Sequence, residues 1–130
     1  MSLVEVAAAL IRDERGRYLI AQRAAGAPHA GLWEFPGGKR HAGESLEECL
    51  RRELTEELGA RFQVGERVDV VVWPETDPTI ALSFYRCLHE DGAIEARAAQ
   101  TVAWVEPARL GDYDFPPADR ALIDRLRTAG

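Results

Sequence analysis

The chain has 130 residues and a mass of 14.4 kDa, which is the size of one globular domain and leaves no room for a second. Hydrophobic residues make up 46% of it, enough to build a core without disulfides or structural metals. The formal net charge of −6 argues against broad binding to nucleic acid polymers but allows one small anionic ligand. We therefore expect a single domain over residues 1–130 that acts on a small molecule, as a monomer or a homodimer.

No apolar stretch approaches the roughly 18 residues that span a bilayer, and no basic segment precedes an apolar run at the N-terminus. This pattern predicts a cytoplasmic protein without a membrane partner. Cys49 and Cys87 lie far apart and outside any metal-binding spacing, so we expect two reduced, partly buried thiols.

The first third of the chain has strand patterns. Residues 4–11 are apolar and contain β-branched side chains, a turn-rich segment follows, and residues 17–22 resume the apolar pattern, which predicts a β-hairpin. Residues 24–31 show no period and are expected to form a loop before a short strand at 32–35. Pro36 and the two glycines after it are expected to end that strand.

Residues 45–58 carry the clearest helical pattern. Ser45 and Glu48 have the spacing of a capping box, and Gly59 stands where a left-handed glycine closes a helix. Leucines recur every four residues and mark one apolar face: Leu46, Leu50, Leu54 and Leu58.

The second half of the chain has three more strand patterns and one helical pattern. β-Branched residues are dense in 61–73, a turn-rich segment separates this strand from 79–88, and residues 101–105 form a last short strand. After a pair of prolines, residues 118–127 place their apolar side chains on one helical face. The series predicts an α/β fold in which helices pack on the faces of a mixed sheet.

The chemical interest lies on the predicted central helix. Glu53, Glu56 and Glu57 fall within one arc of about 100°, because i+3 and i+4 neighbours project from the same side. Their like charges repel, and Mg²⁺ or Mn²⁺ prefers clustered carboxylate oxygens, to which the loop at Gly38 can add a carbonyl. Arg52 lies four residues before Glu56 and can orient it. From the residues alone, a metal site and a solvated acidic helix face both remain open.

The spacing of the charged residues resembles a known signature. Gly38, five residues, Glu44, seven residues and then the run RELTEELG at 52–59 resemble the Nudix box of the Nudix hydrolases. The box spans residues 38–60, with Ala60 where a bulkier aliphatic residue is usual.

The resemblance extends beyond the box. The runs LWEFPGGK at 32–39 and DFPPAD at 114–119 look like the MutT-type branch, which cleaves nucleoside triphosphates. This resemblance implies an α/β/α sandwich around a mixed sheet. It also implies attack of water on a phosphorus, giving a nucleoside monophosphate and pyrophosphate.

Roles for the residues of the box follow from the same resemblance. Four groups are implied as metal ligands: the carbonyl of Gly38 and the carboxylates of Glu53, Glu56 and Glu57. Glu53 is expected to act also as the base for the water proton. Glu44 resembles the glutamate that supports the loop, and Arg52 resembles the arginine that orients a ligand glutamate. Mg²⁺ is the expected metal, with Mn²⁺ as a substitute.

Four residues are expected to contact the substrate. By resemblance Arg23 meets the phosphates, whereas a solvated surface arginine is the alternative. Trp33 and Phe35 alternate on one predicted strand and so point to one face, where they wall either a base pocket or the core. Asp119 matches the position at which MutT-type enzymes present a polar side chain to the base; the alternative is a cap of the last helix.

The residue at position 119 bears on the choice of base. MutT has an asparagine there, which suits an oxidised guanine edge, whereas an ionised aspartate only accepts hydrogen bonds and favours guanine or cytosine donors. We expect an oxidised purine triphosphate such as 8-oxo-dGTP first, with CTP or a modified dCTP as the alternative. A catalytically silent nucleotide-binding module is the hypothesis from another class, and the intact glutamates argue against it.

One segment departs from the family pattern. MutT-like chains often carry a further acidic metal ligand shortly before the strand that bears Trp104. This sequence has Ala98, Ala99 and Gln100 there, and Glu95 is the nearest carboxylate upstream. Completion of the coordination by Glu95, by Gln100 or by water stays open, and so does the number of metal ions.

Overall fold

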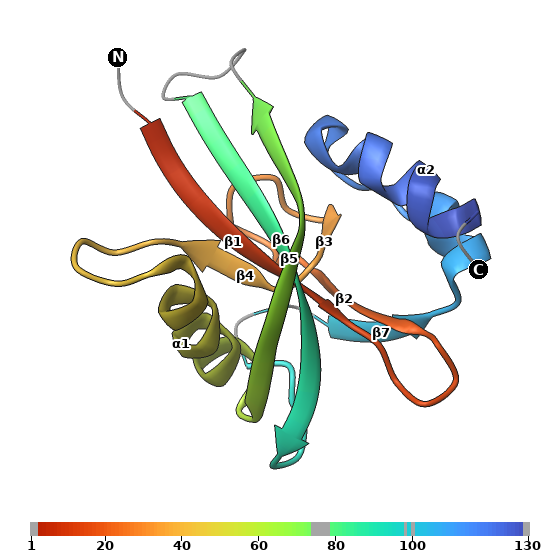
Figure 1. Ribbon diagram of the computed structural model, residues 1–130. Helices are drawn as coiled ribbons and strands as arrows, with labels where there is room; N and C mark the ends of the chain where they lie inside the picture. Colours follow the sequence, from red (N-terminus) through yellow and green to blue (C-terminus); the bar gives the residue numbers. More distant parts are fainter. Residues whose placement is uncertain (1–2, 74–78, 98, 100, 129–130) are drawn as a thin grey trace.

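The computed structural model describes residues 3–73, 79–97, 99 and 101–128. Its strands are β1 (Leu3–Ile11), β2 (Tyr18–Gln22), β3 (Trp33–Glu34), β4 (Gly37–Lys39), β5 (Arg61–Trp73), β6 (Thr79–Asp91) and β7 (Thr101–Val105) (Figure 1). Its helices are α1 (Leu46–Leu58), the 3₁₀ segments η1 (Pro107–Asp112) and η2 (Pro117–Asp119), and α2 (Arg120–Thr128).

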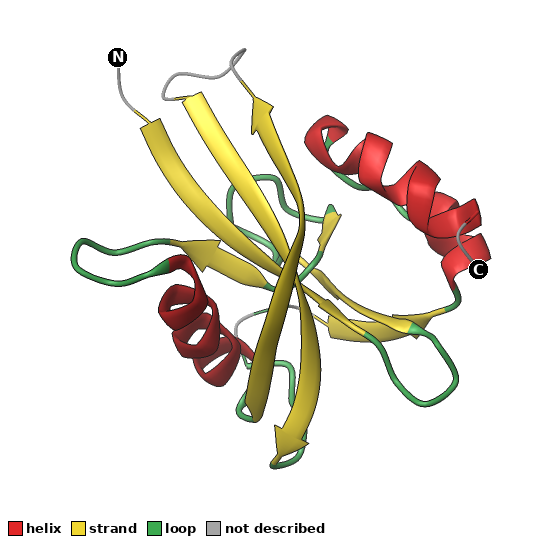
Figure 2. Cartoon of the chain, viewed as in Figure 1, coloured by secondary structure: helices red, strands yellow, loops and turns green. Residues whose placement is uncertain are grey.

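The strands form two sheets. The larger has the order β4-β1-β6-β5 and is mixed, because β1 runs parallel to β6 and antiparallel to β4. The smaller has the order β3-β2-β7 and is antiparallel. Helices α1 and α2 lie on opposite sides of the larger sheet (Figure 2). The predicted mixed sheet with flanking helices is therefore confirmed.

Strand β1 lies at the centre of the core. Because alternate residues of a strand point to opposite faces, Ala7 and Ile11 pack in the cluster beneath α1, whereas Ala8 and Leu10 pack in the cluster beneath α2. All four side chains are buried. Burial on both faces explains why this segment reads as a near-continuous apolar run rather than as an alternating one.

The predicted hairpin of residues 4–11 and 17–22 is wrong. β1 and β2 belong to different sheets and meet at an isolated bridge between Arg12 and Tyr18. β1 instead pairs with β6 along its whole length. Since β6 occupies one edge of β1 and β4 the other, β2 pairs with β3 and β7.

Helix α1 begins and ends where the sequence predicts. The Ser45 hydroxyl accepts the Glu48 amide, and the Glu48 carboxylate accepts the Ser45 amide. Gly59 ends the helix with a left-handed φ of 68°, and its N–H donates to the carbonyl of Thr55. The buried face carries Cys49, Leu50, Leu54 and Leu58. Packing of this face against the sheet turns the acidic face toward β4.

Other boundaries differ from the prediction. Strand β3 ends before Pro36 as expected, but the two glycines then begin a strand of their own, β4, in the larger sheet. Strand β6 continues to Asp91, and the last helix begins at Arg120 after the 3₁₀ turn η2. Within the described ranges, no helix has the length and apolar character needed to cross a membrane.

Candidate active site

Two glycines bring strand β4 against the acidic face of α1. A Cβ atom on Gly37 would lie 1.9 Å from the carbonyl oxygen of Ala7 on β1. A Cβ atom on Gly38 would lie 2.4 Å from Cδ of Glu53 on α1. At Gly37 any side chain would collide with the backbone of β1, whereas at Gly38 it would displace the end of the Glu53 side chain. At this close approach, the N–H of Gly37 donates to Oε2 of Glu57 at 3.2 Å.

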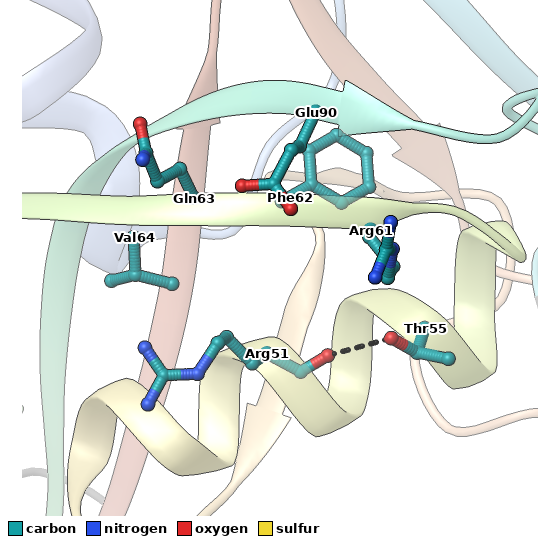
Figure 3. A pocket seen from close by; sticks show the side chains of 7 residues that line it. All are labelled: Arg51, Thr55, Arg61, Phe62, Gln63, Val64 and Glu90. Carbon is teal, nitrogen blue, oxygen red and sulfur yellow. Dashed lines mark hydrogen bonds between the residues drawn. The ribbon is translucent and has the colours of Figure 1, made fainter.

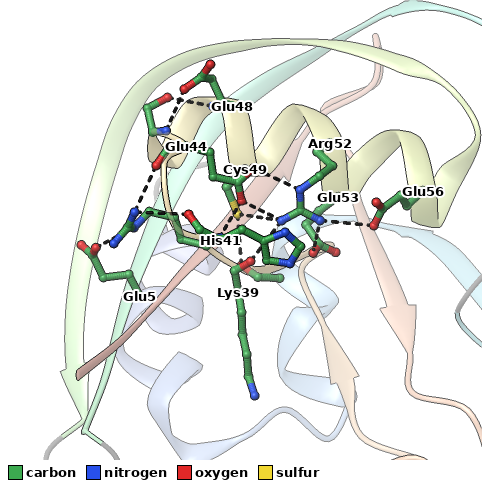
Figure 4. A network of polar contacts seen from close by, with 12 residues as sticks. Glu5, Lys39, His41, Glu44, Glu48, Cys49, Arg52, Glu53 and Glu56 are labelled. Atoms are coloured by element: carbon green, nitrogen blue, oxygen red, sulfur yellow. Dashed lines mark hydrogen bonds and ion pairs between the residues drawn. The ribbon is translucent and has the colours of Figure 1, made fainter. Parts of the chain in front are cut away.

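The guanidinium of Arg52 lies at the centre of a polar network (Figure 4). It binds both carboxylate oxygens of Glu44, at 2.8 and 3.1 Å. Its Nη1 also donates to Oε1 of Glu53 at 2.9 Å and to Oε2 of Glu56 at 3.3 Å. Hydrogen bonds from Arg52 and from the His41 amide lower the pKa of Glu44 to about 2. Arg52 therefore ties the loop before α1 to two glutamates of the helix.

Glu57 is a half-buried carboxylate beside other carboxylates. Burial, together with the negative charges of Glu34 and Glu53, raises the pKa of Glu57 to about 8. Burial also raises the pKa of Glu34, against the lowering effect of Arg23. Carboxylates that repel one another in a partly buried setting favour a cation between them, and their hard oxygens suit a divalent ion. The donor set present here therefore fits such a metal.

A cavity of about 700 Å³ opens beside these carboxylates. It gathers side chains and backbone from β2, β3, β4, α1 and η2. Among its lining residues are Arg23, Glu34, Phe35, Gly38, Glu53, Glu57 and Asp119. Most of the residues predicted for metal and substrate thus share one cavity, whose size suits a nucleotide.

Phe35 and Asp119 line this cavity, whereas the structure does not bring Trp33 into it. Trp33 packs edge-on against Tyr113, with ring centroids 5.1 Å apart. Both aromatic side chains nevertheless belong to the core cluster beneath α2, in which Phe35 is buried and Trp33 is partly buried. Asp119 is 5% exposed, and burial raises its pKa to about 7, with the charge of Glu34 adding to the effect.

A second cavity, of about 360 Å³, lies on the other side of α1 (Figure 3). Arg51 and Thr55 line it from the helix, and the Thr55 hydroxyl donates to the Arg51 carbonyl at 3.0 Å. Arg61 and Phe62 line it from β5. It contains none of the predicted site residues, because these project from the opposite face of α1.

Comparison with known proteins bears directly on this site. The NUDIX domain family matches residues 7–125. The chain belongs to this family. The CTP pyrophosphohydrolase of Escherichia coli (strain K12) and the 8-oxo-dGTP diphosphatase of Haemophilus influenzae are each 38% identical to it, over 95% of this chain and 91% of theirs. The crystal structure of the MutT protein from Methanosarcina mazei Go1 is similar at a TM-score of 0.85 and 27% identity, covering 95% of this chain and 92% of that one.

Membership of the Nudix family, together with diphosphatase relatives, identifies the chain as a hydrolase of phosphoric anhydride bonds. Nudix hydrolases generally need a divalent metal ion. In the described part of the chain, no three His, Cys, Asp or Glu side chains already stand in a metal-binding arrangement. Instead, Arg52 bonds to oxygens of Glu53 and Glu56. The side chain of Glu56 is 60% exposed and can therefore turn away from Arg52.

Of the described residues just before β7, Glu95 and Arg97 do not line the cavity of this Nudix domain. Glu95 pairs with Arg97 at 3.3 Å and is not among the residues that line the cavity. The N–H groups of both residues donate to the last carbonyls of α1. Ala99 lines the cavity, whereas Ala98 and Gln100 lie outside the described residues. The carboxylate of Glu95 is therefore not placed with the other acidic groups.

The sequence analysis missed Glu34. It stands between Trp33 and Phe35, and no motif in the sequence marks it as a site residue. In the structure Glu34 pairs in register with Ala21, and both residues line the cavity. Its place beside Arg23 depends on the register between β2 and β3, for which the local sequence carries no signal.

Proposed function

We propose that this Nudix hydrolase is a nucleoside triphosphate pyrophosphohydrolase, which converts a nucleoside triphosphate and water to the monophosphate and pyrophosphate. The observation that carries the proposal is the single cavity shared by Arg23, the α1 carboxylates Glu53 and Glu57, and Asp119. A nucleotide needs these three things: a cation for its phosphates, acidic groups for its metal and a polar group for its base. The proposed substrate is 8-oxo-dGTP, the substrate named for the Haemophilus influenzae relative.

Mg²⁺ is the proposed metal, with Mn²⁺ as a substitute, and the proposed ligands are the Gly38 carbonyl and the carboxylates of Glu53, Glu56 and Glu57. When bound, the metal polarises phosphoryl oxygens and lowers the pKa of a bound water. Glu53 is proposed to take the proton of the attacking water, and Arg23 to bind the phosphates. Arg52 orients Glu53 and Glu56, while Glu44 holds Arg52 in place.

Asp119 and Phe35 are proposed to bind the base. Phe35 supplies an apolar wall, and Asp119 supplies hydrogen bonds. Because burial raises its pKa to about 7, Asp119 populates both protonation forms near neutral pH. Its ionised form accepts from N1–H and N2–H₂ of a guanine, and its protonated form also donates.

CTP or a modified dCTP is the second candidate substrate. The cytosine amino group donates to an ionised carboxylate, and one relative at 38% identity is a CTP pyrophosphohydrolase.

Pyrophosphate release with Mg²⁺ tests the proposal. The panel holds 8-oxo-dGTP, dGTP, CTP, 5-methyl-dCTP and ADP-ribose, compared by kcat/KM. We expect a marked preference for 8-oxo-dGTP over dGTP. A preference for cytosine nucleotides would establish the second candidate instead. Silence on every nucleotide, with binding retained, would mean a nucleotide-binding module and would contradict the proposed activity.

A further inference from the structure

Glu34 and Arg23 form an ion pair inside the cavity. Nη1 of Arg23 donates to Oε1 of Glu34 at 2.9 Å, and the two side chains are 32% and 30% exposed. Glu34 lies opposite Ala21 in the β2–β3 pairing. Arg23 comes two residues after Ala21 and so projects from the same face. Both members of the pair line the cavity as a result.

A second set of contacts fixes the other side of Arg23. Its Nε donates to the carbonyl of Pro28 at 2.7 Å. Its main-chain N–H donates to the Leu32 carbonyl at 2.9 Å, and its own carbonyl accepts the N–H of Gly31. Hydrogen bonds thus join Arg23 to three residues of the loop between β2 and β3. The remaining nitrogen, Nη2, donates to no described residue, which leaves it available for an anion in the cavity.

Arg23 has competing partners in this cavity. Glu53 and Glu57 line it too, and Arg23 lies near enough to Glu57 to lower its pKa. A long, flexible cation released beside two carboxylates would pair with them. Such a pair would occupy the oxygens proposed for the metal and remove the cation proposed for the phosphates. In the structure Arg23 is paired with Glu34 instead.

We infer that Glu34 is a positioning residue for substrate binding, which holds the Arg23 guanidinium at the cavity wall, ready for the phosphates, and keeps it away from the carboxylates of α1. The inference rests on the proposed function, since it takes this cavity to be the nucleotide site. Glu34 acts through Arg23 and touches no reacting atom. Its effect is therefore expected on substrate binding rather than on the chemical step.

Steady-state kinetics on the preferred substrate of the panel tests the inference. Glu34→Gln is expected to raise KM about tenfold while kcat stays within about twofold. Glu34→Asp keeps the carboxylate and should recover part of that loss. The matched control is Glu66→Gln, which breaks the exposed ion pair between Glu66 and Arg86, away from the cavity. The control should leave KM unchanged.

A double-mutant cycle shows whether Glu34 works through Arg23. In an Arg23→Ala background, Glu34→Gln is expected to add no further rise in KM, because the residue that it positions is gone. Binding of 8-oxo-dGMP without metal, measured by calorimetry, should weaken about as much in Glu34→Gln as KM rises. The calorimetric measurement does not depend on turnover, so it can be made even on variants that have lost activity.

Two outcomes would overturn the inference. Additive effects in the cycle would mean that Glu34 acts independently of Arg23. A fall in kcat with KM unchanged would place Glu34 in the chemistry or in metal binding instead. Failure of the proposed function would look different, because the unaltered protein would then hydrolyse no nucleotide. If the unaltered protein is active and Glu34→Gln leaves KM unchanged, only the positioning role is refuted.

Discussion

Arg52 binds both carboxylate oxygens of Glu44, through Nη2 at 2.8 Å and through Nε at 3.1 Å. This planar, two-pronged pairing fixes the orientation of the guanidinium as well as its position. The nitrogen that is left, Nη1, then reaches Glu53. The loop residue Glu44 thereby sets where a carboxylate of helix α1 stands.

Arg52→Lys is expected to lower kcat/KM by about tenfold to a hundredfold while the chain stays folded. Lysine keeps the charge but cannot bind Glu44 at two points and Glu53 at a third. Kinetics and circular dichroism measure the two effects. Arg51→Lys is the matched control, because Arg51 is the neighbouring arginine on α1 but lines the second cavity instead of the active-site cavity. An equal loss in the control would contradict the role of the network.

Glu53→Gln is expected to lower kcat by about 10²- to 10⁴-fold, since the amide cannot take the proton of the attacking water. Binding of the nucleotide, measured by calorimetry, should be retained. Glu47→Gln, at an exposed position on the same helix, is the control and should keep full activity. Unchanged turnover in Glu53→Gln would show that the base is a different group.

Alanine substitutions at the two glycines of β4 are expected to have different effects on activity and stability. In Gly38→Ala the new methyl group meets the end of the Glu53 side chain, which can move. Activity should therefore fall at least about tenfold with a small loss of stability. In Gly37→Ala the methyl group meets the backbone of Ala7, which cannot move, so the free energy of unfolding should fall by more than about 2 kcal/mol. Kinetics and urea unfolding distinguish the two, and identical stability losses would refute this assignment.

Stability of the metal-free protein is expected to fall as pH rises. Glu57 and Asp119 have pKa values of about 8 and about 7, raised from ordinary values of 4.5 and 3.8. Between about pH 4 and pH 8 these two carboxyl groups therefore hold more protons in the folded than in the unfolded state, so their contribution to the free energy of unfolding decreases as pH rises. Asp119→Asn removes one of these groups and should flatten the decline below pH 7. Urea unfolding in EDTA at several pH values measures the free energy of unfolding of the unaltered protein and of Asp119→Asn. If the two free energies change with pH in parallel, this prediction is wrong.

The sequence by itself determined helix α1 and the order of residues upon it. The capping box at Ser45, the leucine stripe and Gly59 are local signals, and the structure confirms each of them. The arc shared by Glu53, Glu56 and Glu57 follows from helical geometry alone. Their proposed roles as metal ligands come from the resemblance of the box and remain predictions.

Only the tertiary structure decided which strands pair and what lies beside what. The sequence predicted that β1 pairs with β2 in a hairpin, whereas in the structure β1 lies inside the larger sheet between β4 and β6. The contact between Glu34 and Arg23 is likewise visible only in the structure. The burial of Asp119 also depends on the tertiary structure, since segments distant in the chain enclose its carboxyl group. Strand register and enclosure arise from contacts between distant segments, whereas periodicity and caps report only the few residues around them.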